Sequence, residues 1–209
     1  MLFHYHFWTP LLEETERYYA SQGFKTHLRI GKYKGDFVTF NPPLTWDDIR
    51  DKEILFRIIE MRKGIVNITF GFGKEIIFDH IGFLVEQSEH DQICEKAIKM
   101  EWKVNIDERR TFITTPYQFR IELQTHLDVI DYNQDEILIQ QMVLNTRQTG
   151  LEEDLAFLFG KDQKLEIQVL TENQPVTIRE VVITDPCIQN SQDPNGVKVM
   201  RTLRGKLAT

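Results

Sequence analysis

Two histidines stand at matching points of an internal repeat. The segment His4-Tyr5-His6-Phe7 aligns with His80-Ile81-Gly82-Phe83, and each segment precedes an amphipathic helical pattern. This alignment predicts that His4 and His80 occupy equivalent positions on equivalent strands. Imidazole nitrogens are common ligands of divalent metals, so two histidines that converge from different strands are candidate metal ligands.

A polar stripe follows a predicted strand near the middle of the chain. Successive side chains of a strand point to opposite faces, so the apolar residues of the segment 119–123 share one face. The opposite face carries Gln118, Arg120, Glu122, Gln124 and His126. Five polar side chains on one face predict water, a ligand or a metal there. The same alternation places Asn67 with Thr69 on one strand, and His6 with His4 on another.

Glu122 lies between apolar neighbours in a predicted central strand, where an unpaired buried carboxylate is unfavourable. A metal, water or an arginine must satisfy it, and Arg110 and Arg120 are the alternatives to an ion. Each histidine also has the alternative of a core residue that donates to a backbone carbonyl. His6 becomes the ligand in place of His4 if the register shifts, although the spacing to the following helix favours His4.

The composition is that of an ordinary folded chain without excess positive charge. Its 25 Lys and Arg against 32 Asp and Glu give a net charge of −7, and 41% of the residues are hydrophobic. This balance provides no general field for a phosphate backbone, so nucleic-acid binding is not expected. No apolar run approaches the ~20 residues of a membrane helix, and the first residues do not resemble a secretory signal. We therefore expect a cytoplasmic protein with no membrane or nucleic-acid partner.

The predicted elements form three units along the chain. In the first unit, residues 1–74, a strand from Phe3 to Trp8 leads to a helix that ends near Gly23. Strands at about 24–30 and 36–41 follow. A capping box of Thr45 and Asp48 then predicts a helix running to Gly64, before a strand at 65–72.

The second unit, residues 75–126, restarts the pattern with a strand over 78–85 and a helix opened by Ser88. Three further strands are predicted at about 102–107, 110–115 and 118–125. The third unit, residues 127–209, is predicted as a partial copy that ends in a tail. It comprises a strand from Ile137, a helix ending at Gly160, strands near 164–170 and 177–183, and a loop from Asp185 to Gly196.

The sequence resembles the vicinal oxygen chelate superfamily of glyoxalase I, extradiol dioxygenases, bleomycin-resistance proteins and methylmalonyl-CoA epimerase. The resemblance is strong over residues 3–125 and weaker over residues 137–184. Its matching features are His4, the pair Tyr18-Tyr19, the exit Gly23-Phe24, the strand His80-Ile81-Gly82-Phe83, and the run from Thr115-Pro116 to Ile121-Glu122-Leu123.

The resemblance implies an α+β fold in which paired βαβββ modules form a cup-shaped mixed sheet, with a C-terminal partial βαββ module beside it. Glu122 falls on the carboxylate ligand position of the family. The implied metal ligands are therefore His4, His80 and Glu122, holding Fe, Mn, Zn or Ni. The implied substrate pocket is lined by His6, Asn67, Thr69, Gln118, Arg120, Gln124 and His126.

The implied function is that of a divalent-metal-dependent enzyme acting on a small molecule with vicinal oxygens, by isomerisation, lyase chemistry or extradiol-type dioxygenation. Glyoxalase-like members use a fourth ligand from the last strand of the first module, where this chain offers Asn67 and Thr69. Three ligands are closer to the extradiol dioxygenases. The alternative is a metal-free binding or sequestration protein of the bleomycin-resistance type. A homodimer is possible, because family members often pair.

Overall fold

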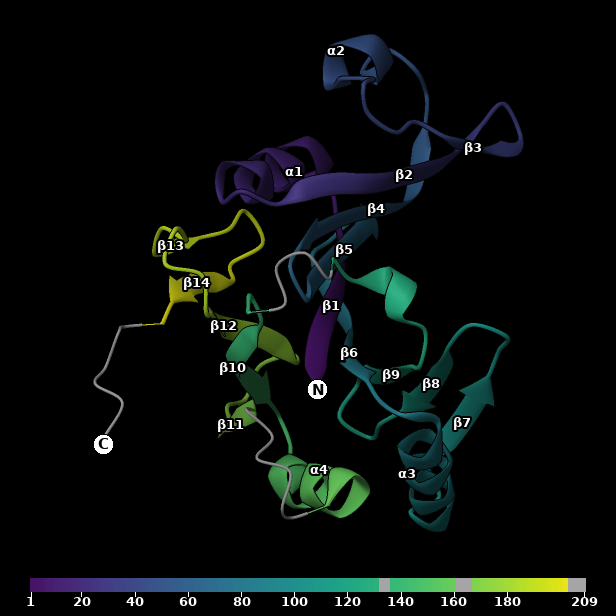
Figure 1. Cartoon of the computed structure of the whole chain (residues 1–209), viewed down its shortest axis with the longest axis vertical. Coiled ribbons are helices and arrows are strands. Elements are labelled where there is room, and N and C mark those ends of the chain that lie inside the picture. Colours follow the sequence, from purple (N-terminus) through teal and green to yellow (C-terminus); the bar gives the residue numbers. More distant parts are fainter. Residues whose placement is uncertain (132–135, 161–166, 203–209) are drawn as a thin grey trace.

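The computed structural model describes residues 1–131, 136–160 and 167–202. Two mixed sheets with a few helices make up the fold, which confirms the predicted α+β class (Figure 1). The first sheet contains β1 (Leu2–Thr9), β2 (Lys25–Tyr33), β3 (Asp36–Thr39), β4 (Leu55–Lys63), β5 (Val66–Phe72), β6 (Ile77–Leu84), β7 (Lys103–Ile106), β8 (Thr111–Thr114) and β9 (Arg120–Gln124). The helices of this half are α1 (Leu12–Ser21), α2 (Trp46–Ile49), α3 (Gln87–Lys99) and the 3-10 turn η1 (Leu127–Val129).

The nine strands of the first sheet are ordered β3-β2-β4-β5-β1-β6-β9-β8-β7. At its centre β1 runs parallel to β5 and antiparallel to β6, and β6 runs parallel to β9. One face of these strands supplies the core, where Tyr5, Ile68, Ile81, Phe83 and Ile121 have essentially no exposed surface. The polar residues that alternate with them point to the other face.

The helix predicted over residues 45–64 is wrong for most of its length. Its capping box forms between Thr45 and Asp48, but α2 ends at Ile49 and residues 55–63 form β4, between β2 and β5. The apolar residues of this segment also fit helical spacing, yet Leu55 is 54% exposed. As a strand, the segment forms backbone hydrogen bonds with β2 on one side and β5 on the other. These hydrogen bonds stabilise it more than an isolated helix would.

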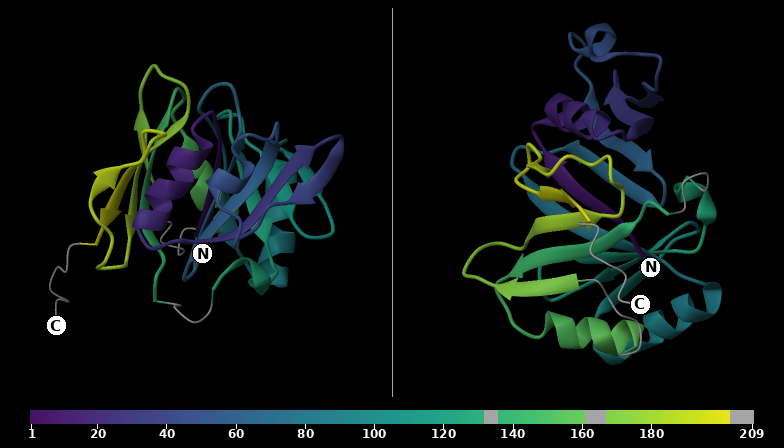
Figure 2. Two further views of the ribbon diagram at one scale, coloured as in Figure 1. Left: turned by 90° about the horizontal axis from the view of Figure 1, so that it is seen from above. Right: turned by 60° about the vertical axis from the view of Figure 1, so that its left-hand side comes forward.

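The second sheet is ordered β11-β10-β12-β14-β13 and lies beside the first (Figure 2). Its elements are β10 (Ile139–Thr146), α4 (Leu151–Phe159), β11 (Ile167–Thr171), β12 (Thr177–Ile183), β13 (Ser191–Gln192) and β14 (Lys198–Arg201). The segment Asp185–Gly196, expected to be loop throughout, thus contains the short strand β13. Of the strand predicted near 164–170, residues 164–166 lie outside the described residues, as does the tail after residue 202.

The second sheet repeats the pairing of the first in reduced form. In it β10 runs parallel to β11 and antiparallel to β12, and β12 runs parallel to β14, as β1, β5, β6 and β9 do. The irregularities of register match as well. Phe3 and Asp79 are passed over in the β1–β6 ladder, and Gln140 and Arg179 are passed over at the corresponding points of the β10–β12 ladder.

The two sheets share one apolar core and are also joined by polar contacts. Tyr19 of α1 donates to Asp193 at 2.8 Å, and Lys63 at the end of β4 forms an ion pair with Asp185. Helices α3 and α4 lie side by side at one end of the molecule, where the Lys96 ammonium donates to the backbone carbonyl of Leu158 (Figure 1). No helix in the described ranges is long and apolar enough to span a membrane.

Candidate metal centre

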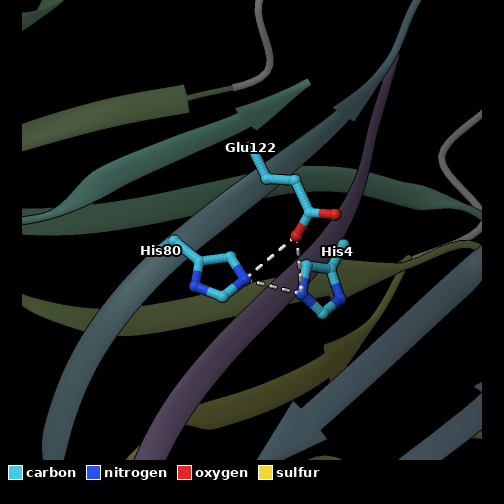
Figure 3. A group of neighbouring side chains, drawn as sticks. All are labelled: His4, His80 and Glu122. Carbon is cyan, nitrogen blue, oxygen red and sulfur yellow. Dashed lines mark hydrogen bonds and ion pairs between the residues drawn. The ribbon is translucent and has the colours of Figure 1, made fainter. Parts of the chain in front are cut away.

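The register of the central strands brings the three predicted ligands together. His4 on β1 pairs with Gly82 on β6, and Gly82 pairs with Glu122 on β9. His80 lies two residues from Gly82 on the same face, opposite His6 of β1. The two histidines and the glutamate therefore converge from three adjacent strands on one side of the sheet (Figure 3).

Gly82 provides the space that His4 occupies. A β-carbon at residue 82 would lie 2.8 Å from Cβ and 3.0 Å from Cδ2 of His4, and 3.0 Å from Cε1 of Phe3. Such distances are too short for ordinary carbon contacts. The missing side chain thus allows the imidazole to cross the middle strand toward Glu122.

The three donor atoms are close and buried. The Nε2 atoms of His4 and His80 lie 3.1 Å apart, and Oε2 of Glu122 is 3.1 Å from Nε2 of His80 and 3.7 Å from Nε2 of His4 (Figure 3). Each of the three residues is at most 5% exposed. Ligand atoms that each lie ~2.1 Å from one metal ion have mutual separations of this size.

Contacts on the far side of each ring fix which imidazole nitrogen carries the proton. Nδ1 of His4 lies 3.0 Å from the backbone carbonyl of Asn67, and Nδ1 of His80 lies 2.6 Å from Oδ2 of Asp79. A carbonyl or a carboxylate only accepts hydrogen bonds, so both Nδ1 atoms donate. In the neutral rings both Nε2 atoms are therefore unprotonated, and their lone pairs point at each other and at Glu122.

Asp79 reaches His80 because β6 is bulged at this residue. The pairs His6 with His80 and Phe7 with Phe78 leave Asp79 without a partner on β1. In a bulge the extra residue departs from strict alternation, so Asp79 lies beside the imidazole that follows it in sequence. Arg120 forms an ion pair with Asp79 and thereby holds the carboxylate in place.

Burial sets the charges of the cluster. It lowers the pKa of His4 to about 4, so that this imidazole is neutral at pH 7. Burial opposes the ionisation of Glu122, but a hydrogen bond from His80 and the positive charge of the two imidazoles in their protonated forms outweigh it and hold the pKa of Glu122 below its usual value. When both rings are neutral, by contrast, the carboxylate and the two imidazole lone pairs repel one another at these distances, and a divalent cation between them would remove that repulsion. The donor set fits such an ion.

A cavity of about 720 Å³ opens onto the three donors. Strands β1, β2, β4, β5, β6, β8 and β9 contribute to its walls. Five of the predicted pocket residues line it, namely His6, Asn67, Thr69, Arg120 and Gln124. Gln118 and His126 do not line it, because both lie beyond the ends of β9, where the alternation of that strand no longer applies.

Several cavity residues were not found from the sequence. Asp79 was missed because strand alternation places it on the face opposite His80. The one signal in the sequence that could have identified it as a partner of His80 is that it directly precedes this candidate ligand. Glu60 was missed because its segment was predicted as a helix. Phe112 was also missed, and it lies edge-on to His80 at 5.1 Å between ring centres. Trp8, which strand alternation places on the same face as His4 and His6, lines the cavity as well.

Glu60 and Asn67 are engaged with other groups rather than with the three donors. Oε1 of Glu60 accepts from Arg62 and from Nδ2 of Asn67, each at 2.6 Å. Nδ2 of Asn67 also donates to the carbonyl of Val129 at 2.8 Å. Among the described residues, His4, His80 and Glu122 are the one group of three or more His, Cys, Asp or Glu residues whose ligand atoms lie within 4.8 Å of one another.

Comparison with known proteins gives structural likeness without sequence likeness. No family model matches the chain, and no curated protein matches it. The structure is similar to 2,2',3-trihydroxybiphenyl 1,2-dioxygenase from Sphingomonas wittichii strain RW1, with a TM-score of 0.65, 10% identity, and 97% of this chain and 90% of that chain covered.

Two further solved structures show the same likeness. Homoprotocatechuate 2,3-dioxygenase from Arthrobacter globiformis has a TM-score of 0.59 and 10% identity, over 96% of this chain and 79% of that chain. The Mn(II)-bound glyoxalase from Novosphingobium aromaticivorans has a TM-score of 0.53 and 10% identity, over 87% of this chain and 64% of that chain. These likenesses show that the chain has the fold shared by these two dioxygenases and the glyoxalase.

Proposed function

We propose that the protein is a divalent-metal-dependent enzyme that binds a small molecule through two adjacent oxygens and catalyses its extradiol-type dioxygenation. The observation that carries this proposal is the group of His4, His80 and Glu122, in which three buried acceptor atoms converge. Two histidines and one carboxylate are the ligand set typical of non-haem iron oxygenases, because they leave coordination positions open.

The residues around the ligands have separate roles in this proposal. His4 and His80 would hold the ion through Nε2, and Glu122 would hold it through Oε2. When bound, a divalent ion polarises coordinated oxygens and favours their deprotonation. One carboxylate against two positive charges leaves a net positive centre, which selects an anionic oxygen chelate. Asn67 and Asp79 keep both imidazoles in the orientation that presents Nε2.

Three features support dioxygenation over isomerisation. The neighbouring carboxylate of Glu60 is occupied by Arg62 and Asn67, so the donor set stays at three. Several of the similar solved structures are dioxygenases by name. The aromatic rings of Trp8 and Phe112 on the cavity wall also suit a planar substrate beside the ligands.

The first test is metal content, measured by elemental analysis of the untagged protein. The His4→Ala, His80→Ala and Glu122→Ala variants are measured beside it, with Glu95→Ala as a control on the exposed side of α3. We expect one equivalent of iron or manganese in the wild type and in Glu95→Ala, and its loss from the other three variants.

The second test is oxygen consumption by the loaded protein with a panel of catechols. Uptake that requires His4, His80 and Glu122 supports dioxygenation. One equivalent of zinc or nickel without oxygen uptake would redirect the assignment to glyoxalase-like isomerisation. A protein that takes up no metal after reconstitution, and still binds small aromatic ligands, would be a metal-free binding protein instead.

A further inference from the structure

A second polar group lies against the three ligands and is not explained by metal binding. Oγ1 of Thr69 is 2.7 Å from Nδ1 of His6 and 3.4 Å from Nε2 of His4. The His6 ring lines the cavity, stacks on His80 with 4.9 Å between ring centres, and meets Trp8 edge-on. Its Nε2 is buried and has no hydrogen-bond partner in the described part of the chain.

The single hydroxyl proton of Thr69 has two possible acceptors in this arrangement. If it is donated to Nε2 of His4, Thr69 accepts from Nδ1–H of His6, and the other nitrogen of His6 is an acceptor. If it is donated to Nδ1 of His6, that nitrogen is unprotonated, and Nε2 of His6 is a donor. The state of His4 therefore determines which hydrogen-bonding group His6 offers at Nε2.

A metal on Nε2 of His4 uses the lone pair that the Thr69 hydroxyl would otherwise meet. The hydroxyl proton then has His6 Nδ1 as its remaining acceptor among the contacts of Thr69. We propose that Thr69 links metal occupancy of His4 to the tautomer of His6, so that the loaded site presents Nε2–H of His6 as a donor to a cavity ligand. His6 is then a residue that determines ligand specificity.

This inference rests on the proposed function and narrows its substrate class. The preferred ligand has, beside its metal-bound oxygen, an acceptor oxygen such as an enolate, phenolate or carboxylate. A ligand that carries a hydroxyl donor at this point, or an apolar group, leaves Nε2–H of His6 unpaired. The doubly protonated form of His6 would also donate from Nε2, so the conclusion does not depend on the charge of the ring.

Long-range proton–nitrogen NMR spectra of protein labelled with ¹⁵N-histidine test the link directly. Spectra are recorded without metal and with one equivalent of Zn²⁺, a diamagnetic ion, and the His6 signals are assigned through a His6→Phe variant. With Zn²⁺ bound, we expect coordination shifts at Nε2 of His4 and His80, and a His6 ring protonated at Nε2. A His6 ring protonated at Nδ1 alone in the Zn²⁺-loaded wild type would overturn the inference.

Two variants separate the hydroxyl from the shape of the threonine. Thr69→Val keeps the shape and removes the hydroxyl, so Zn²⁺ should still shift His4 and His80 while His6 loses its tautomer preference. Thr69→Ser keeps the hydroxyl and should behave as the wild type. If His6 keeps its tautomer preference in Thr69→Val, the inference about Thr69 is wrong, but the proposed function is unaffected. If Zn²⁺ causes no shift at His4 and His80, the proposed function on which the inference rests is wrong.

The same variants give a binding readout that does not require turnover. We expect the Zn²⁺-loaded wild type and Thr69→Ser to bind 4-nitrocatechol, followed by its absorbance, about tenfold more tightly than Thr69→Val, the effect of one hydrogen bond. The His6→Phe variant should match Thr69→Val. Equal affinities in all four proteins would show that His6 does not contact the ligand.

Discussion

At the scale of single residues, the centre is defined by the partners on the outer side of each imidazole. Asn67 and Asp79 accept hydrogen bonds from the Nδ1 atoms of His4 and His80. These hydrogen bonds fix the tautomer and the orientation of each ring, so that the Nε2 lone pairs point at the centre. The two partners differ in kind. The acceptor at residue 67 is a backbone carbonyl of β5, which remains when the Asn67 side chain is replaced. The acceptor at residue 79 is a side-chain carboxylate, which a single substitution of Asp79 removes.

Replacing Asp79 by alanine is expected to weaken metal binding 10–100-fold, because His80 loses the acceptor that orients it and raises its basicity. Competition with a coloured chelator gives the affinity. The matched control is Asp107→Ala, which removes another carboxylate from the cavity wall, one that accepts from the backbone amide of Glu108 rather than from His80. Equal affinities for both variants would show that Asp79 does not support His80.

The lowered pKa of His4 predicts a loss of stability in mild acid for the metal-free protein. Unfolded His4 takes up a proton near pH 6.5, but folded His4 does so only near pH 4. Between these values the unfolded state binds more protons, so the free energy of unfolding decreases as the pH falls, by up to about 3 kcal/mol. Urea unfolding at several pH values measures this, and His4→Gln should show a shallower decrease. The same slope in both proteins would assign the effect to other groups.

The sequence supports the placement of individual residues only where strand alternation holds. His4, His6, Asn67, Thr69, Arg120, Glu122 and Gln124 all lie within strands, and all line the cavity. Gln118 and His126 continue the alternation in the sequence, but they lie beyond the two ends of β9 and do not line the cavity. Asp79 violates alternation because a bulge depends on how two strands pair, which the sequence of one strand does not reveal.

At the scale of elements, the close approach of three strands depends on a position without a side chain. Gly82 lies between His4 and Glu122 in the register, and its backbone φ is not in the region that favours glycine. Its role is therefore steric. Strand β6 supplies His80 and makes room for the other two ligands.

Substitution of Gly82 by alanine should displace His4 and reduce metal affinity by at least tenfold, since one lost or distorted ligand costs at least ~1.4 kcal/mol. The fold should survive with a loss of about 1–3 kcal/mol from overpacking. Calorimetric metal titration and urea unfolding measure the two effects. Gly35→Ala is the control for general destabilisation: Gly35 has a φ of +101°, so an alanine there is strained, but its β-carbon meets nothing within 4 Å and metal affinity should be kept. Unchanged metal affinity in Gly82→Ala would contradict the steric role.

The elements of the second unit were predictable, whereas β4 was not. The strand–helix–three-strand order of residues 77–124 follows directly from alternation, a helix start and turns. In β4, the buried residues Ile59 and Met61 alternate as on a strand, but Phe56 and Ile59 are three residues apart, as on a helix, because Arg57 is passed over in the β2–β4 ladder. Pairing with β2 and β5 on either side makes this segment a strand. Both partners lie outside residues 55–63, so the spacing within the segment alone predicted the wrong element.

At the scale of the whole molecule, one buried acid contributes to the polar contacts that join the two sheets. Oδ1 of Asp193 accepts from the backbone amides of Asn195 and Val197, and its Oδ2 accepts from the hydroxyl of Tyr19. Tyr19 in turn contacts the hydroxyl of Tyr5 at 3.1 Å. This chain of hydrogen bonds ends on the face of β1 that lies away from the metal ligands.

Replacement of Asp193 by alanine should lower the free energy of unfolding by about 3 kcal/mol, because several buried donors lose their acceptor at once. Metal affinity should stay within about threefold of the wild type, since β1 keeps its register with β5 and β6. Urea unfolding and chelator competition give the two numbers. A large loss of metal affinity with unchanged stability would mean that the second sheet acts on the centre directly.

The matching bulges of the two sheets separate the backbone geometry of the centre from its side chains. At the positions that correspond to His4, His80 and Glu122, the second sheet carries Gln141, Glu180 and Met200, which do not form a comparable ligand set. Nevertheless it keeps both irregularities, at Gln140 and Arg179. The bulges therefore do not depend on the presence of a metal-ligand set. Strand pairing brings the corresponding positions of both sheets together, and the two histidines and the glutamate are what distinguish the first sheet from the second there.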